Sequence, residues 1–423
     1  MNNMKVYMES YGCSANQADG EMMLGLLKKG GFDIVNSPES SDVNIINTCV
    51  VKSPTENRMI YRIKKLASLK KPVIVTGCMP KTEKKTIEKI APKASLLGPD
   101  SIEKIVDAVN AKIAGERKIF LENLRRPKVC LPRVRKNPVI EICEISTGCL
   151  GRCFFCEVKF AKEKLFSYPV GMILEEIENS LRDDCKEIWI TSQDCGCWGR
   201  DRKSTLPGLL NKICEIEEKF LVRIGMMNPT HVRDIVDGII NSYKSGKIFK
   251  FLHLPVQSGS DEILKKMNRD YSVDDFRKII RKFRTEFPLL TLSTDIIVGF
   301  PGEAEGDFQK TIDLMKEIEP DIVNISKFGA RPRTKAAKMK QLSVKVINKR
   351  SKKLMEIVKK IQLEKNKKWV GWKGEVLVDE AKVKNFIGRN FAYKPVVLKE
   401  GKLGNFKTVE IDSVSHTSLF SST

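Results

Sequence analysis

The chain has 423 residues, 41% hydrophobic and 30% charged, which is enough for two or three domains that each bury a core. Its 75 Lys and Arg residues outnumber 53 Asp and Glu residues, giving a net charge of +22. This excess favours a polyanionic partner, most often nucleic acid, over a lysine-rich surface adapted to temperature or ionic strength. No apolar run could cross a bilayer and no signal peptide is visible, so we expect a cytoplasmic protein without a membrane partner. Twelve cysteines in a reducing compartment then indicate metal or redox chemistry rather than disulfides.

Residues 4–115 alternate between predicted strands and helices. Strands are predicted at 4–12, 32–35, 42–49 and 72–78, and helices at 18–31, 55–71, 82–90 and 102–113. This alternation predicts a parallel sheet with right-handed crossovers, and we assign residues 1–117 to an N-terminal α/β domain. The segment 125–138 has three prolines and six basic residues, which is typical of an interdomain linker.

The alternation resumes beyond this segment. Six more strands are predicted at 140–146, 187–194, 221–228, 251–258, 292–300 and 322–328, with helices between them. Six such units predict a partial or complete α/β barrel of the TIM type, and we place this core at 135–366. It includes a long basic helix at 338–368. From Gly374 the pattern becomes all-β, which predicts a small C-terminal β-barrel within residues 367–423.

Three cysteines lie close together after the first barrel strand. Cys149, Cys153 and Cys156 are spaced by three and then two residues, and none of the chain's three histidines is near them in sequence. A structural zinc site needs four ligands, so zinc would require a distant fourth ligand. A 4Fe–4S cluster can instead be held by three cysteines, with its fourth iron open to a non-protein ligand.

This loop resembles that of the radical S-adenosylmethionine enzymes, whose cluster cysteines have the same spacing. Phe155 matches the aromatic residue usual before the last cysteine. The resemblance implies that S-adenosylmethionine binds the open iron and that its reductive cleavage produces a 5′-deoxyadenosyl radical.

A second set of cysteines, Cys13, Cys49 and Cys78, is spread along the N-terminal domain. Each follows a predicted parallel strand, and the carboxyl ends of parallel strands share one edge of a sheet, so we expect the three thiols to converge. Coincidence among buried cysteines is the alternative explanation. The surrounding segments YGCSANQADGE, NTC and TGC resemble the N-terminal domain of the methylthiotransferases. This resemblance implies a second 4Fe–4S cluster that carries the sulfur to be inserted.

Several barrel residues are candidates for contacts with S-adenosylmethionine. The segment TSQDCGCWG resembles the family segment near the methionine part of the cofactor, and FLHLPVQSGSDEILKKMNRDY and STDIIVGFPGE match two further family segments. A guanidinium such as that of Arg269 can bind a carboxylate in a bidentate manner. The candidate contacts are Phe155, Ser192, Gln193, Gln257, Ser258, Arg269 and Val298. Polar strand ends that merely face solvent are the alternative for each segment.

The remaining histidine and cysteine residues are given no catalytic role. His253 lies in a strand and is more typical of a barrel interior than of a base. The remaining cysteines are interpreted as structural or incidental, and Cys195 and Cys197 remain open because they follow a strand at the active end of the barrel. These cysteines are Cys130, Cys143, Cys185, Cys195, Cys197 and Cys214.

The C-terminal part is predicted to bind RNA. Residues 374–423 resemble the TRAM domain, and GRNFAYKPVVL matches a TRAM segment. Arg389, Phe391, Tyr393 and Lys394 combine base-stacking and phosphate-binding side chains, which suits single-stranded RNA. One departure is ARPRTKAAKM, where Arg333 and Lys335 replace a glycine and a proline of the family pattern.

Taken together, the segments resemble the archaeal and eukaryotic methylthiotransferases that convert N6-threonylcarbamoyladenosine at position 37 of tRNA into its 2-methylthio derivative. This implies a transferase with two 4Fe–4S clusters, S-adenosylmethionine, a tRNA substrate and an electron donor such as a flavodoxin or ferredoxin, acting as a monomer. Methylthiolation of N6-isopentenyladenosine or of a ribosomal-protein aspartate stays open, as does a non-catalytic RNA-binding zinc protein.

Overall fold

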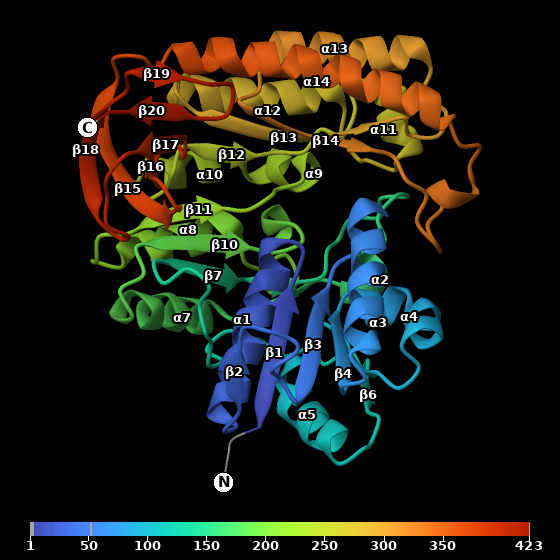
Figure 1. The fold of residues 1–423 in the computed structure, drawn as a ribbon. Coiled ribbons are helices and arrows are strands. Elements are labelled where there is room, and N and C mark those ends of the chain that lie inside the picture. The colour runs from blue at the N-terminus through green and yellow to red at the C-terminus, as the bar shows by residue number, and fades with distance from the viewer. Residues whose placement is uncertain (1–3, 51–52, 423) are drawn as a thin grey trace.

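The computed structural model describes residues 4–50 and 53–422, and it has three parts (Figure 1). The N-terminal part is a parallel six-stranded sheet of order β2-β1-β3-β4-β5-β6. Its strands are β1 (Lys5–Ser10), β2 (Asp33–Val35), β3 (Val43–Thr48), β4 (Val73–Gly77), β5 (Ser95–Leu97) and β6 (Ile119–Phe120). Its helices are α1 (Ser14–Lys29), α2 (Ser53–Ser68), α3 (Met79–Thr82), α4 (Lys84–Ile90) and α5 (Ile105–Ile113).

The central part is an open α/β barrel made of two three-stranded parallel sheets, β7-β10-β11 and β12-β13-β14. A parallel bridge between Val222 and Ile248 joins the two sheets. The strands are β7 (Ile140–Glu144), β10 (Glu187–Thr191), β11 (Leu221–Ile224), β12 (Phe251–His253), β13 (Thr291–Val298) and β14 (Ile322–Lys327), with β8 (Ser146–Thr147) and β9 (Phe166–Ser167) forming a separate pair. The helices are α6 (Lys159–Lys162), α7 (Val170–Arg182), α8 (Leu206–Glu215), α9 (Pro229–Val232), α10 (Val236–Tyr243), α11 (Asp261–Lys266), α12 (Val273–Glu286) and α13 (Glu305–Ile318).

The N-terminal and central parts share one hydrophobic core. Helix α1 packs against β7, and Val6 and Met22 belong to the same buried cluster as Ile140 and Ile142. Trp189 of β10 packs against this cluster from the barrel side. A shared core of this kind fixes the two domains relative to each other, because separating them would expose apolar surface.

The segment 125–138 is an ordered strap between these parts, and this differs from the expectation of a linker. Lys128 is almost fully buried, and the backbone of Pro132 lies so close to Gly25 of α1 that a Cβ there would be 2.2 Å from the Pro132 carbonyl oxygen. The backbone N–H of Val134 also donates to the carbonyl of Glu21, 2.9 Å away. Three of its six basic side chains, those of Lys128, Arg133 and Arg135, pair with buried carboxylates of the two domains.

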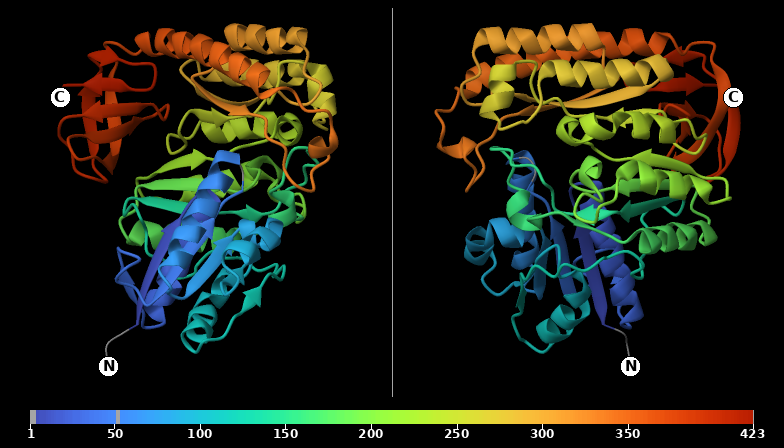
Figure 2. Two further views of the ribbon diagram at one scale, coloured as in Figure 1. Left: turned by 45° about the vertical axis from the view of Figure 1, so that its right-hand side comes forward. Right: turned by 180° about the vertical axis from the view of Figure 1, so that it is seen from behind.

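The long helix α14 (Val344–Lys367) lies along the outer side of the barrel and leads into the C-terminal part (Figures 1 and 2). That part is a curled six-stranded sheet of order β18-β15-β16-β17-β20-β19. Its strands are β15 (Lys373–Ala381), β16 (Phe386–Asn390), β17 (Pro395–Leu398), β18 (Phe406–Glu410), β19 (Ser413–Val414) and β20 (Leu419–Ser421). In the described part of the chain, no helix combines the length and the apolar character that crossing a membrane requires.

Candidate active site

The structure brings Cys13, Cys49 and Cys78 to one edge of the N-terminal sheet. Cys13 immediately precedes α1, Cys49 follows β3, and Cys78 follows β4. Because β1, β3 and β4 are adjacent and parallel, their carboxyl ends lie side by side. The backbone N–H of Cys78 donates to the carbonyl of Thr48, 3.1 Å away, which ties two of the three loops together.

Two glycines permit this close approach. Gly12 and Gly77 have φ of +112° and +90°, in the region that favours glycine. A Cβ on Gly12 would lie 2.7 Å from the Cβ of Cys49, and one on Gly77 would lie 2.3 Å from the carbonyl oxygen of Thr48. A side chain at either position would therefore push the cysteine loops apart.

The electrostatics of these thiols suit a bound cation. Burial raises the pKa of the Cys78 thiol well above its usual value, the Lys162 ammonium opposes this shift, and the neighbouring Cys13 and Cys49 thiols increase it. Thiolates so close together repel each other unless a metal or cluster neutralises them. Their role as ligands of a second cluster stays a prediction.

The central triad occupies one loop between β8 and α6. Cys149, Cys153 and Cys156 are each half-buried there. Burial raises the pKa of Cys156 to about 11, and Cys153 and Cys149 contribute to this increase. By contrast, a hydrogen bond donated by the Cys197 thiol lowers the pKa of Cys149. The structure therefore places three thiols of one loop within reach of one another, at the carboxyl side of the barrel.

Contacts from the barrel hold the middle of this loop. The N–H of Phe154 donates to the carbonyl of Met267 at 3.0 Å, and its carbonyl accepts from the N–H of Ala336 at 3.1 Å. Phe155 packs edge-to-face against Phe300, with ring centroids 6.5 Å apart. Phe155 thus contributes to an apolar cluster beneath the loop, and its contact with the cofactor stays a prediction.

Arg269 reaches this loop from the turn after α11. Its Nη1 donates to the Cys153 sulfur at 3.1 Å, its Nη2 to Asn228 Oδ1 at 2.9 Å, and its Nε to the Tyr271 hydroxyl at 3.1 Å. The guanidinium therefore places a positive charge beside the Cys153 sulfur and fixes its own position through Asn228 and Tyr271. The sequence identified Arg269 as a carboxylate ligand but did not indicate its contact with a cluster cysteine.

The residues predicted to contact the cofactor lie at the carboxyl ends of several strands. Gln193 Oε1 accepts a 2.6 Å hydrogen bond from the N–H of Gly148, so this side chain positions the start of the cysteine loop. The Ser192 hydroxyl donates to the Cys195 sulfur, 3.4 Å away. The segment after β10 therefore contacts the start of the cysteine loop through Gln193, whereas Ser192 contacts a residue of its own segment.

The other predicted contacts are more deeply placed. Gln257 has φ of +70°, and it pairs with Ile296 in a parallel bridge beside β13. Ser258 is buried, and its hydroxyl lies 3.5 Å from the Thr311 hydroxyl, so it stabilises the turn before α11. Val298 at the end of β13 is buried as well.

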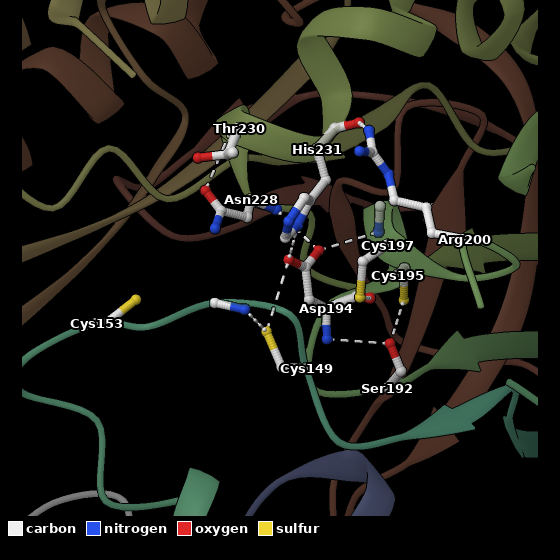
Figure 3. Close-up of polar contacts among 12 residues, drawn as sticks. Cys149, Cys153, Ser192, Asp194, Cys195, Cys197, Arg200, Asn228, Thr230 and His231 are labelled. Atoms are coloured by element: carbon white, nitrogen blue, oxygen red, sulfur yellow. Dashed lines mark hydrogen bonds and ion pairs between the residues drawn. The ribbon is translucent and has the colours of Figure 1, made fainter. Parts of the chain in front are cut away.

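Sequence reasoning missed the polar group around Asp194. Figure 3 shows the Asp194 carboxylate beside His231, with Cys149 and Cys197 close by. Asp194 Oδ2 lies 2.6 Å from His231 Nδ1, and Oδ1 accepts from the N–H of Asn228 at 3.0 Å. The available signal was the sequence TSQD at a strand end, but the partner His231 lies 37 residues away.

A buried charge quartet, formed by Asp19, Lys128, Glu144 and Lys162, joins the two cysteine regions. Lys128 pairs with Asp19 and, at 2.6 Å, with Glu144, while Lys162 lies 2.9 Å from Glu144 and 3.7 Å from Asp19. All four side chains are almost fully buried. Burial opposes the charge on Lys162, but Glu144 and Asp19 outweigh it and raise the pKa of this ammonium.

The loop that departs from the family pattern rests against the central triad. Arg331 pairs with Glu56 of α2, and its Nε lies 3.8 Å from Glu157. Arg333 has φ of +67°, so the backbone keeps the left-handed conformation that suits the family's glycine. The Arg333 guanidinium lies 4.5 Å from the ring centroid of Phe160 in α6, so it places a positive charge beside the segment that follows the central triad.

Of the four residues predicted to contact RNA, Tyr393 and Lys394 are buried, Arg389 is half-buried and Phe391 is exposed, and their contact with RNA stays a prediction. Lys394 Nζ donates to Asp321 Oδ1 of the barrel at 2.8 Å, and Arg389 Nε donates to Asp379 Oδ2 at 2.9 Å. Each of these two cations therefore pairs with a carboxylate of the protein, Lys394 with 6% of its side-chain surface exposed and Arg389 with 19%.

Tyr393 is also held inside this interface. Its ring packs against Phe249 and Phe251 of the barrel, with centroids 4.8 and 5.1 Å away. Only Phe391 is exposed, at 38% of its surface. The GRNFAYK segment thus docks the C-terminal sheet onto the barrel, and its alternation of basic and aromatic residues reflects that interface.

Comparison with known proteins identifies the family. The model of uncharacterized protein family UPF0004 matches residues 5–98, and that of the radical SAM superfamily matches residues 143–315. The radical S-adenosylmethionine methyltransferase TsrM of Kitasatospora setae superimposes with a TM-score of 0.58 at 13% identity, covering 79% of this chain and 75% of that chain. The fold and the central cysteine loop therefore define a radical SAM protein.

Sequence relatives identify the branch. The chain is 42% identical to the probable threonylcarbamoyladenosine tRNA methylthiotransferase of Pyrococcus horikoshii, covering 98% of both chains. It is 39% identical to the protein of that name from Methanothermobacter thermautotrophicus, covering 99% of both. It is 34% identical to the threonylcarbamoyladenosine tRNA methylthiotransferase of Homo sapiens, covering 96% of this chain and 72% of that protein. The chain belongs to the threonylcarbamoyladenosine tRNA methylthiotransferase family.

Proposed function

We propose that this protein converts N6-threonylcarbamoyladenosine at position 37 of tRNA into its 2-methylthio derivative by radical SAM chemistry. The full-length similarity to relatives of that name supports the substrate. The observation that carries the reaction is the packing of α3, which begins after Cys78, against α6, which begins three residues after Cys156. Sulfur insertion requires a sulfur source and a radical source beside one substrate atom, and this packing makes the two triads neighbours.

The donor sets fit two 4Fe–4S clusters, one on Cys149, Cys153 and Cys156 and a second on Cys13, Cys49 and Cys78. Each triad offers three thiolates, which leaves one iron for a ligand that is not a side chain. When bound, the central cluster with S-adenosylmethionine supplies the radical that removes hydrogen from an unreactive carbon, and the second cluster supplies the sulfur.

The chain's own residues prepare these sites. Arg269 donates a hydrogen bond to the Cys153 sulfur at 3.1 Å and so helps to position this proposed ligand. Gln193 holds Gly148 and therefore the start of the cysteine loop. Ser192, Gln257, Ser258, Val298 and Phe155 are proposed to frame the cofactor, by contact or by supporting the strand ends that contact it.

We further propose that the protein acts as a cytoplasmic monomer that receives electrons from a flavodoxin or ferredoxin. Its contact with RNA is assigned to Phe391 and to the exposed lysines of α14, which face solvent with few acidic neighbours. These lysines are Lys345, Lys349, Lys352, Lys353, Lys359, Lys360 and Lys367.

The test is mass spectrometry of tRNA nucleosides from a strain that lacks the protein. We expect 2-methylthio-N6-threonylcarbamoyladenosine to disappear, to return with the wild-type gene, and to stay absent with Cys49→Ala or Cys153→Ala. An unchanged pool would refute the proposal. Loss of a methylthiolated isopentenyladenosine, or of a modified ribosomal-protein aspartate, would instead identify one of the sister activities.

A further inference from the structure

Cys197 and Asp194, which the proposed reaction does not use, form a donor set with the proposed cluster ligand Cys149. Cys197 belongs to the short 3-10 helix Cys195–Cys197 after β10, and its thiol is buried. The ligand atoms of Cys149, Asp194 and Cys197 all lie within 4.8 Å of one another, and no other such group occurs in residues 4–50 and 53–422. In the view of Figure 3, Asp194 is drawn between Cys149 and Cys197.

The spacing of these atoms suits a small tetrahedral cation. With Zn–S bonds of about 2.3 Å and Zn–O bonds of about 2.1 Å, neighbouring ligands of tetrahedral zinc lie roughly 3.5–3.8 Å apart. The Cys149 sulfur lies 4.0 Å from Asp194 Oδ2, so a small side-chain rotation suffices to reach that spacing. Two thiolates and one carboxylate are ligands that Zn²⁺ accepts, and the ion would offset two of their three negative charges in a buried place.

The carboxylate is already oriented for this role. Asp194 Oδ1 accepts hydrogen bonds from the N–H groups of Gly196 and Asn228, both at 3.0 Å. His231 Nδ1 lies 2.6 Å from Oδ2, and the 3.0 Å bond between Arg200 and the His231 carbonyl holds the backbone of that residue. Hydrogen bonds of this kind to a ligating carboxylate are typical supports of metal sites, and losing one typically costs 10- to 100-fold in affinity.

We propose that the cluster-free protein binds one Zn²⁺ through Cys149, Cys197 and Asp194, with water completing the coordination. Because Cys149 is also a proposed ligand of the central cluster, zinc and the cluster exclude each other. The site would protect the Cys149 thiolate before the cluster is inserted and would let excess zinc inhibit that insertion. The proposal concerns the chain without its clusters, so it does not depend on which substrate the loaded enzyme modifies.

Cobalt absorbance tests the site directly. The probe is Co²⁺ added under anaerobic conditions to the full chain in which the five other proposed cluster cysteines are alanine. We expect one tetrahedral Co²⁺ per chain with thiolate-to-cobalt charge-transfer absorbance, bleached by Zn²⁺. Cys197→Ser and Asp194→Asn should weaken binding at least tenfold, and His231→Ala about 10- to 100-fold.

Cys195→Ser is the matched control, since Cys195 is equally buried but contacts Ser192 and the Ile190 carbonyl rather than Asp194. It should leave the cobalt spectrum and affinity unchanged. Equal cobalt binding by the Cys197→Ser and Cys195→Ser proteins would overturn the proposal.

A second measurement uses the chain with all its cluster cysteines, in case the multiple variant does not fold. Iron incorporation during anaerobic reconstitution is followed by absorbance and iron content while Zn²⁺ is increased. Cys197→Ser should load iron as the wild type does without zinc, because Cys197 is not a proposed cluster ligand, and should need at least tenfold more zinc for half inhibition. Identical zinc sensitivity of the two proteins would overturn the proposal, because zinc would then be held by the cluster triads alone.

Discussion

Replacing Lys162 by methionine tests whether the buried quartet fixes the two cysteine regions relative to each other. Lys162 Nζ lies 2.9 Å from Glu144 Oε1 and 3.7 Å from Asp19 Oδ2. At an effective dielectric constant of 20, these pairs attract by about 6 and about 4.5 kcal/mol, against a desolvation cost of several kcal/mol per ion. Lys162→Met leaves two buried carboxylates with only Lys128, so we expect it to lower the free energy of unfolding by about 3–5 kcal/mol.

The double variant Lys162→Met/Glu144→Gln is the critical control. It removes one cation and one anion, so Lys128 and Asp19 remain as a neutral pair, and we expect it to be no less stable than Lys162→Met alone. The assay is urea unfolding of the cluster-free chain followed by tryptophan fluorescence, since Trp189 packs on the core shared by the two domains. If the losses caused by Lys162→Met and Glu144→Gln simply add in the double variant, the quartet does not act as a unit and the reasoning fails.

Three further predictions use the same unfolding assay. Arg333→Gly should be more stable than Arg333→Ala by about 1 kcal/mol, because both lose the guanidinium but only glycine relieves the left-handed backbone; equal stabilities would contradict this. Burial, and then Asp379, raises the pKa of Glu187 to about 8, so the native state binds its proton more tightly than the unfolded state and stability falls as pH rises from about 4.5 through about 8. Glu187→Gln should therefore gain stability over the wild type with increasing pH, and a constant difference from pH 5 to 9 would exclude this cause. Lys394→Met should lower the free energy of unfolding by about 3 kcal/mol, because it leaves Asp321 without this partner. Phe391→Ala should lower the free energy of unfolding less but should weaken RNA binding by about 1–3 kcal/mol in a binding titration. If Lys394→Met instead weakened RNA binding more and stability less than Phe391→Ala, Lys394 would belong to the RNA surface.

The order of elements was predictable because periodicity and turn residues are local signals. The strands next to Cys13, Cys49 and Cys78 were predicted at 4–12, 42–49 and 72–78 and are observed at Lys5–Ser10, Val43–Thr48 and Val73–Gly77. The parallel sheet was predicted from the helices between them. The segment 125–138 was predicted as a linker, but its packing was not predictable, because its composition does not reveal that Lys128 and Arg133 meet carboxylates contributed by other segments.

The parts of the site that could be predicted are those whose residues have a characteristic spacing in the sequence. The two cysteine triads could be proposed from sequence, since three thiols on one loop, or three at the ends of adjacent parallel strands, must come near one another. The partners that position them could not, because Asp194 with His231 and Lys162 with Glu144 are ordinary polar residues whose pairing exists only in the folded chain.

The segment that carries Arg389, Tyr393 and Lys394 shows the same difference between what composition suggests and what the folded chain contacts. Arg389 and Tyr393 are residue types that often contact nucleic acids. A guanidinium and an aromatic ring are equally suited to an interface between domains when a carboxylate such as that of Asp379 is present. Since these side chains dock the C-terminal sheet, an RNA that follows this face would meet residues that stay exposed, among them Phe391 and the lysines of α14. Helix α14 runs from the C-terminal sheet towards the end of the barrel that carries the cysteine loop (Figure 1). A chain of exposed lysines along it therefore connects the place proposed to hold RNA with the place proposed to modify it.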